Sequence, residues 1–174
     1  MAPRAPALHG HAAYKKITLA ALAVLFLVSC KEQVAIEPPG DAPVFTVRFD
    51  KSLSEQAQDG RLLLMLSSHD EKEPRFLVGV SADSQLIFGR NVEGWKPGEA
   101  VAVDQSAIGF PLADLSQLPA GDYYAQALLN RYKDFHLANG KVVSLPPDRG
   151  EGQQRNRKPG NFYSKPVKLS ISAQ

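Results

Sequence analysis

The amino-acid sequence predicts an all-β fold, an antiparallel sandwich of about seven or eight strands. Short apolar or alternating segments follow one another between residues 44 and 171, and turn residues such as Pro, Gly, Asn and Ser separate them. No long segment has apolar residues that recur about every 3.6 residues, as they do in an amphipathic helix. Short strands at regular spacing without helices are typical of a sandwich or a barrel.

The strands are predicted in chain order from their local patterns. The side chains of residues 44–49 would alternate between the two faces of a strand, with Phe45, Val47 and Phe49 together on one face. Residues 61–67 form a continuous apolar run that is too short for a buried helix and has turn residues on both sides, which indicates a central strand. The other predicted strands, of which 122–132 is the longest, cover residues 76–80, 85–88, 100–103, 122–132, 141–145 and 166–171.

Turn residues mark the connections between these strands. Asn139-Gly140 is a hairpin signal, although it leaves residues 133–138 in a long loop. A short helical turn is predicted at residues 112–117. The apolar residues expected in the core are Leu62, Leu64, Leu66, Phe76, Val78, Ala127 and Leu129.

Residues 118–124, Leu-Pro-Ala-Gly-Asp-Tyr-Tyr, lead into the longest predicted strand. They resemble the corner before strand F of immunoglobulin-like sandwiches, where a tyrosine hydroxyl donates a hydrogen bond back to the preceding loop. The resemblance implies an immunoglobulin-like sandwich with Tyr124 or Tyr123 as the corner tyrosine. The alternative is that both rings simply pack within a strand.

Residues 1–29 have the composition of a secretory signal peptide. Arg4, Lys15 and Lys16 precede an apolar run at residues 17–28, and the small residue Ser29 follows that run. The run is shorter than the roughly 20 residues that a membrane-spanning helix needs. The segment is therefore predicted to be a cleaved leader rather than a permanent membrane span.

The end of the leader, Leu27-Val28-Ser29-Cys30, resembles the lipobox of bacterial lipoproteins. The resemblance implies that the chain is cut before Cys30 and that lipid on this cysteine anchors the protein in the cell envelope. Lys31 resembles the next residue of outer-membrane lipoproteins, which implies the outer membrane, facing the periplasm, rather than the inner membrane. Cys30 is the single cysteine of the chain, so no intramolecular disulfide competes for its thiol. The alternative is an ordinary signal peptide beside a chance cysteine.

The predicted domains are the leader, 1–29, a flexible tether, 30–43, and a β-sandwich domain, 44–174. The tether is rich in proline and charged residues and lacks the apolar surface that packing requires. Three of the 20 basic residues lie in the leader, so 17 remain in the mature chain against 18 acidic residues. This nearly neutral balance does not favour nucleic acid as a partner, and we expect none.

No motif in the sequence fixes a reaction. Residues 79–83 lack the second glycine of a nucleophile elbow, and the two histidines of the mature chain, His69 and His136, show no metal-binding spacing. We therefore predict no catalytic residue, no cofactor and no metal. The sequence leaves open whether two carboxylates form a pair for glycoside hydrolysis, because the distance between them depends on the fold and not on their spacing in the chain.

Residues 148–164 form the most unusual segment, because they combine cations, glycines, side-chain amides and aromatic rings. Arginine side chains hold anions bidentately, so one interpretation is a binding loop for an anionic or sugar-like ligand. The alternative is a structural connector before the final strand, either flexible and solvated or pinned by local hydrogen bonds. We expect Phe162 and Tyr163 to pin the end of the loop to the sandwich. The candidate binding residues are Arg149, Glu151, Gln153, Gln154, Arg155, Asn156, Arg157, Asn161 and Tyr163.

Residues 44–171 resemble the accessory β-sandwich region that precedes the catalytic domain in some secreted esterase-like proteins of the α/β-hydrolase kind. The segments that carry the likeness are residues 60–67, 118–127, 148–154, 156–157, 159–161 and 163–164. The resemblance implies a freestanding relative of an accessory module. The catalytic triad of that family has no counterpart in this sequence, so esterase activity is not implied.

Together these observations predict a membrane-anchored, exported lipoprotein that acts as a non-catalytic binding or interaction module. Its expected partners are the membrane, through lipid on Cys30, and an envelope protein or an anionic or sugar-like ligand. An accessory subunit of a separately encoded exported hydrolase is the alternative, and a hydrolase in its own right is the weakest interpretation.

Overall fold

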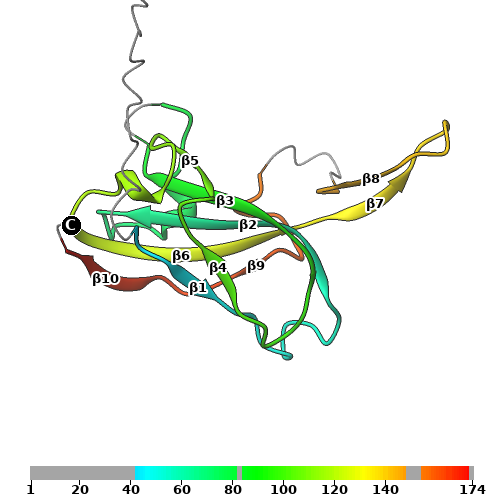
Figure 1. Cartoon of the computed structure of the whole chain (residues 1–174), viewed down its shortest axis with the longest axis horizontal. Coiled ribbons are helices and arrows are strands. Elements are labelled where there is room, and N and C mark those ends of the chain that lie inside the picture. Colours follow the sequence, from blue (N-terminus) through cyan, green and yellow to red (C-terminus); the bar gives the residue numbers. More distant parts are fainter. Residues whose placement is uncertain (1–41, 82–83, 148–153, 173–174) are drawn as a thin grey trace, which may run out of the picture. The chain divides into compact units, whose positions relative to one another are not determined.

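The chain folds into antiparallel β-sheets, which confirms the predicted all-β class (Figure 1). The computed structural model describes residues 42–81, 84–147 and 154–172. The predicted leader with Cys30 lies outside these residues, as do Arg149, Glu151 and Gln153. Within the described ranges, no helix is long and apolar enough to cross a membrane. The strands are β1 (Phe45–Val47), β2 (Gln58–Ser67), β3 (Leu86–Trp95), β4 (Val101–Val103), β5 (Ile108–Phe110), β6 (Gly121–Arg131), β7 (Lys133–His136), β8 (Val142–Leu145), β9 (Phe162–Tyr163) and β10 (Val167–Ile171), and the two 3-10 turns are η1 (Pro74–Phe76) and η2 (Leu115–Gln117).

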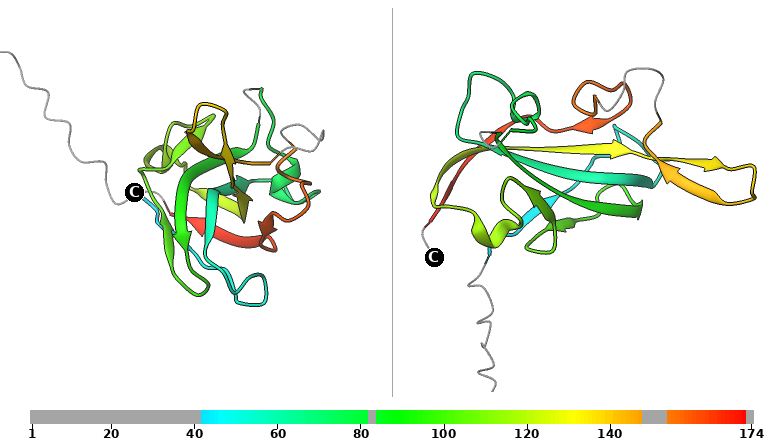
Figure 2. Two further views of the ribbon diagram at one scale, coloured as in Figure 1. Left: turned by 90° about the vertical axis from the view of Figure 1, so that its right-hand side faces the viewer. Right: turned by 90° about the horizontal axis from the view of Figure 1, so that it is seen from above.

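One large sheet and two small ones make up the structure. The large sheet has the strand order β10-β6-β2-β3-β5, and β9 pairs with β6 at residues Leu128 and Leu129, beyond the part of β6 that pairs with β10. β1 pairs with β4, and β7 pairs with β8. Figure 2 shows β1 and β4 lying across one face of the large sheet, so that these two sheets form two layers.

The central strand β2 is apolar on both faces because both faces of the large sheet are covered. Leu62, Leu64 and Leu66 point into the main core, which β1 and β4 close from the other side with Phe45, Val47, Val101 and Val103. The intervening residues, Leu63 and Met65, form a second cluster with Leu128 of β6, covered by Val78 from the segment after η1. This double burial explains why the sequence shows a continuous apolar run there instead of alternation.

Most predicted strands are confirmed, but residues 76–80 are not a strand. Pro74 begins the 3-10 turn η1 instead, and the backbone amide of Leu77 closes it on the Pro74 carbonyl. Proline fits this first helical position because its fixed φ is helical and its missing N–H would have no partner there. Of the predicted core residues in this segment, Val78 packs under the sheet, whereas Phe76 is half-buried beside arginine side chains.

The described residues contain ten strands, more than the predicted seven or eight, because β5, β7 and β9 were not predicted. β5 and β9 are two or three residues long, and only pairing with a longer neighbour defines them as strands. β7 lies in the segment that was predicted to be a long loop. The hairpin turn is short because Gly140 adopts a positive φ of 80°, and its amide bonds to the Leu137 carbonyl at 3.0 Å. The short helical turn predicted at 112–117 is present as η2.

The corner before β6 contains the contact that its sequence resembles. The Tyr123 hydroxyl donates a hydrogen bond of 3.0 Å to the Pro119 carbonyl, four residues earlier. The Tyr123 ring is buried in the main core, and this burial raises the pKa of its hydroxyl. Tyr124 points to the other face, where its hydroxyl lies 3.2 Å from a carboxylate oxygen of Asp70 at the surface. Tyr123 is therefore the corner tyrosine.

We predict that Tyr123→Phe lowers the free energy of unfolding by about 1 kcal/mol, because the Pro119 carbonyl loses a partly buried donor. Tyr124→Phe is the matched control, since its hydroxyl bond is exposed, and it should cost less. Urea unfolding of both variants measures the difference. Equal losses in the two variants would contradict a structural role for the corner.

Candidate functional site

The described part of the predicted binding loop, residues 154–164, is held in a defined turn. The Gln154 carbonyl accepts hydrogen bonds from the amides of Arg157 and Lys158, each at 3.0 Å. The next turn passes through Pro159 and Gly160, and Gly160 adopts a positive φ of 85°. A residue with a Cβ is strained in that conformation, so this glycine fixes the course of the chain at the tip.

Asn161 ties the turn to the sheet. It is buried, and its side-chain amide donates to the side-chain oxygen of Asn130 at 3.1 Å and to the carbonyl of Arg155 at 2.9 Å. Its side-chain oxygen accepts the backbone amide of Arg131 at 3.1 Å. A single asparagine thus joins both ends of the turn to β6, after which Phe162 and Tyr163 continue as β9. The expectation that these two residues pin the loop to the sandwich is confirmed.

Gln126 makes a second attachment from the middle of β6. Its side chain is 1% exposed, and its amide group donates to Glu73 Oε2 at 2.7 Å and to the Ser164 carbonyl at 2.8 Å. Its oxygen accepts the backbone amide of Arg75 at 3.0 Å. The buried amide is thereby satisfied, and it joins η1 to the end of the loop across the same face of the sheet.

Arg75 lies at the meeting point of η1 and the loop. Its Nε donates to Glu73 Oε2 at 2.8 Å, and its Nη1 donates to the Asn156 carbonyl at 3.0 Å. The guanidinium lies 3.6 Å from the centroid of the Tyr163 ring and 4.5 Å from that of Phe76. Cation–π stacking of this kind holds an arginine in one orientation.

Glu73 is the acidic partner in this cluster. Its hydrogen bond from Gln126 and its contact with Arg75 hold the pKa of the carboxyl below its ordinary value of 4.5. The charged form is thus favoured in the folded state. The contribution of this carboxylate to stability is present above pH 4.5 and is lost as the pH falls through the lowered folded-state pKa.

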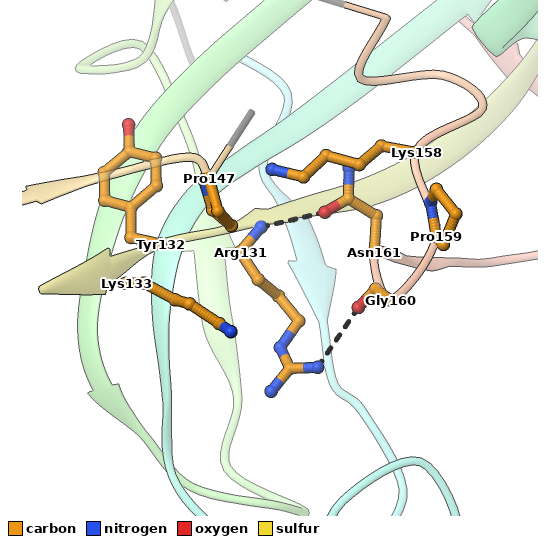
Figure 3. A pocket seen from close by; sticks show the side chains of 8 residues that line it. All are labelled: Arg131, Tyr132, Lys133, Pro147, Lys158, Pro159, Gly160 and Asn161. Carbon is orange, nitrogen blue, oxygen red and sulfur yellow. Dashed lines mark hydrogen bonds between the residues drawn. The ribbon is translucent and has the colours of Figure 1, made fainter. Parts of the chain in front are cut away.

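A hollow of about 520 Å³ opens on one side of the turn at residues 158–161. Arg131 and Lys133, from the end of β6 and the start of β7, line it together with Lys158 (Figure 3). The guanidinium of Arg131 donates to the Gly160 carbonyl at 3.2 Å, which fixes the arginine beside the turn. Its other lining residues in the described chain are Tyr132, Pro147, Pro159, Gly160 and Asn161, none of them acidic.

A second hollow, of about 570 Å³, is lined by the same turn. It shares residues 158–161 with the first and adds Arg75, Phe76, Asn156, Arg157 and Tyr163. Arg157 is exposed, and its guanidinium lies 5.6 Å from the Phe76 ring centroid. No acidic side chain among the described residues lines this hollow either. Cations and aromatic rings thus line both hollows at this turn, and we call this surface the basic turn platform.

The structure brings only some of the predicted binding residues into this platform. Asn156, Arg157, Asn161 and Tyr163 line a hollow, whereas Gln154 and Arg155 line neither and contribute backbone carbonyls. Six lining residues lie outside the predicted loop and were not expected at the site: Arg75, Phe76, Arg131, Tyr132, Lys133 and Pro147. Gln126 was not singled out from the sequence, yet a polar residue within an apolar strand is a signal by which this face could have been found.

Comparison of the chain with protein-family models, with curated proteins and with solved structures finds no match. The platform is therefore interpreted from its own chemistry. Among the described residues, no three His, Cys, Asp or Glu side chains gather to hold a metal ion. His69 lies at the surface with Nδ1 3.6 Å from Glu71, and His136 lies in the β7–β8 hairpin, so neither lines the platform.

We predict that Glu73→Gln lowers the free energy of unfolding at pH 7 by about 1 kcal/mol, since Arg75 loses a charged acceptor at a partly exposed site. The difference from the parent should shrink as the pH falls below 4.5, where the parent carboxyl also becomes neutral. Unfolding curves at several pH values measure it. Glu55→Gln, at an exposed turn, is the control, and a difference independent of pH would contradict the role of the charge.

Proposed function

We propose that the protein is a lipid-anchored, non-catalytic binding module of the cell envelope, and that the basic turn platform is its binding surface. The anchoring part of this proposal rests on the leader and the lipobox-like residues that end at Cys30. The binding part rests on one structural observation. Arg131, Lys133 and Arg157 gather at two hollows whose described lining contains no acidic side chain.

The chemistry of the platform favours an anionic, sugar-like ligand. Arginine guanidinium groups match the planar oxygens of carboxylate and the oxygens of phosphate. The half-exposed ring of Tyr163 offers the flat apolar surface against which a sugar ring packs, and Asn156 supplies polar groups beside it. The platform is also held in place before a ligand arrives, because Asn161 and Gln126 join it to β6. Less ordering is then required on binding.

We predict saturable binding of glucose 1-phosphate to the full chain in non-ionic detergent, and weaker binding of glucose, because glucose lacks the anionic group. Replacing Arg131 and Arg157 together by glutamine should weaken the binding of glucose 1-phosphate at least about tenfold, which corresponds to about 1.4 kcal/mol. Titration calorimetry measures both affinities.

The matched control is the double variant Lys51→Gln, Lys96→Gln, which removes the same charge at exposed positions outside both hollows. Its affinity should equal that of the parent. If both double variants weaken binding equally, the effect is one of net charge and the platform is not the site. Absence of saturable binding to the parent would contradict the proposed ligand class.

A further inference from the structure

The β7–β8 hairpin is amphipathic. The register pairs Lys133 with Leu145 and Phe135 with Val143, and the amide of Leu137 bonds to the Lys141 carbonyl at 2.8 Å, which continues the same register. Residues paired in this way lie on one face of a hairpin. That face therefore carries Lys133, Phe135, Leu137, Lys141, Val143 and Leu145, and we call it the apolar hairpin face.

The opposite face of the hairpin is more polar. It carries Asp134, whose carboxylate accepts a hydrogen bond from the Ser144 hydroxyl, together with His136 and Val142. Asp134 is the single acidic residue of the hairpin, residues 133–145. The apolar hairpin face consequently bears apolar side chains between two lysines and no negative charge.

Within the described chain, most apolar side chains of the apolar hairpin face are exposed, and Val143 is half-buried. Phe135 is 39% exposed, Leu137 44% and Leu145 51%. β7 and β8 pair only with each other, and the hairpin extends from the end of β6 beyond the other strands (Figures 1 and 2). An isolated two-stranded hairpin is marginally stable in water, and an exposed apolar strand surface is a surface for association.

We propose that the apolar hairpin face docks into the headgroup region of an anionic lipid membrane. Apolar side chains between lysines suit this region, because the rings and branched chains enter the acyl boundary while the ammonium groups stay at the phosphates. The single acid of the hairpin points away from the face and does not oppose this contact. A second copy of the chain is a poorer occupant, because two such faces would bring lysines together with no carboxylate between them.

The proposal rests on the proposed function in one respect, that lipid on Cys30 brings the membrane within reach. The tether, residues 30–43, spans at most about 50 Å when extended, which limits the distance between the domain and the bilayer. The hairpin would add a second, reversible membrane contact. A single lipid signal and a weak protein contact reinforce each other in this way.

The test uses the full chain, processed in its host and purified from membranes, with tryptophan placed at single positions of the hairpin. It is reconstituted into phosphatidylethanolamine–phosphatidylglycerol vesicles with brominated acyl chains, which quench nearby tryptophan. Phe135→Trp should show a blue-shifted emission and a loss of intensity beyond that of the parent, whose Trp95 is buried in the core. Leu145→Trp is a second variant on the same face and should behave alike.

Val142→Trp, on the opposite face, is the matched control and should be quenched no more than the parent. Lys133→Gln combined with Lys141→Gln, in the Phe135→Trp background, should reduce the quenching. Absence of quenching at both Phe135→Trp and Leu145→Trp, or equal quenching at Val142→Trp, overturns the proposal. A blue shift that depends on protein concentration in detergent also overturns it, because a second copy then covers the face.

Mass spectrometry of Cys30 in the same preparation separates this proposal from the proposed function. Lipid on Cys30 without quenching leaves the anchor intact and refutes the hairpin contact. Quenching in a preparation that carries no lipid supports the hairpin contact and refutes the anchor. Binding of glucose 1-phosphate by the Phe135→Trp variant, which keeps Lys133 and the other lining residues, reports on the basic turn platform.

Discussion

The side-chain amide of Gln126 is the interaction on which the candidate site depends. It is buried in the middle of β6, and its three hydrogen bonds join Glu73 and Arg75 to Ser164, about 90 positions later in the sequence. A buried amide is costly unless its bonding capacity is used, so these three bonds strongly constrain where η1 and the loop end lie. Arg75 then stacks on Tyr163, and the basic turn platform takes its shape from that contact.

The two faces of the large sheet have different roles. On one face, Leu62, Leu64 and Leu66 pack against β1 and β4 and supply the hydrophobic burial that stabilises the domain. The other face carries a small apolar cluster around Leu63 and Met65. On the same face, the polar side chains of Gln126 and Asn130 in β6 attach η1 and the loop by hydrogen bonds. A polar layer over a rigid sheet suits a binding surface, because the sheet holds the site still while the loop carries the chemistry.

The sequence was informative where structure follows from local patterns. The local patterns located β2 and β6, Asn139-Gly140 located the turn of the β7–β8 hairpin, and the corner motif led to Tyr123. It was not informative where distant segments decide the outcome. The 3-10 turn at Pro74 and Arg75 is held against the sheet by Gln126, about 50 positions later, which accepts the Arg75 amide, and no local pattern encodes that pairing. Arg131 and Lys133 belong to the platform for a similar reason. The turn at residues 158–161 is hydrogen-bonded to the end of β6, and this long-range contact places the two cations beside the turn.

Hydrogen exchange of the full chain tests the central claim, that Gln126 holds the platform, most directly. Gln126→Leu keeps a side chain of similar size but removes the three bonds, and Gln117→Leu, at an exposed turn, is the control. We predict that Gln126→Leu accelerates exchange at the amides of Arg75, Lys158 and Asn161, while the amides shared by β2 and β3 keep their protection. Unchanged exchange at the platform, or equal acceleration throughout the large sheet, would contradict the account.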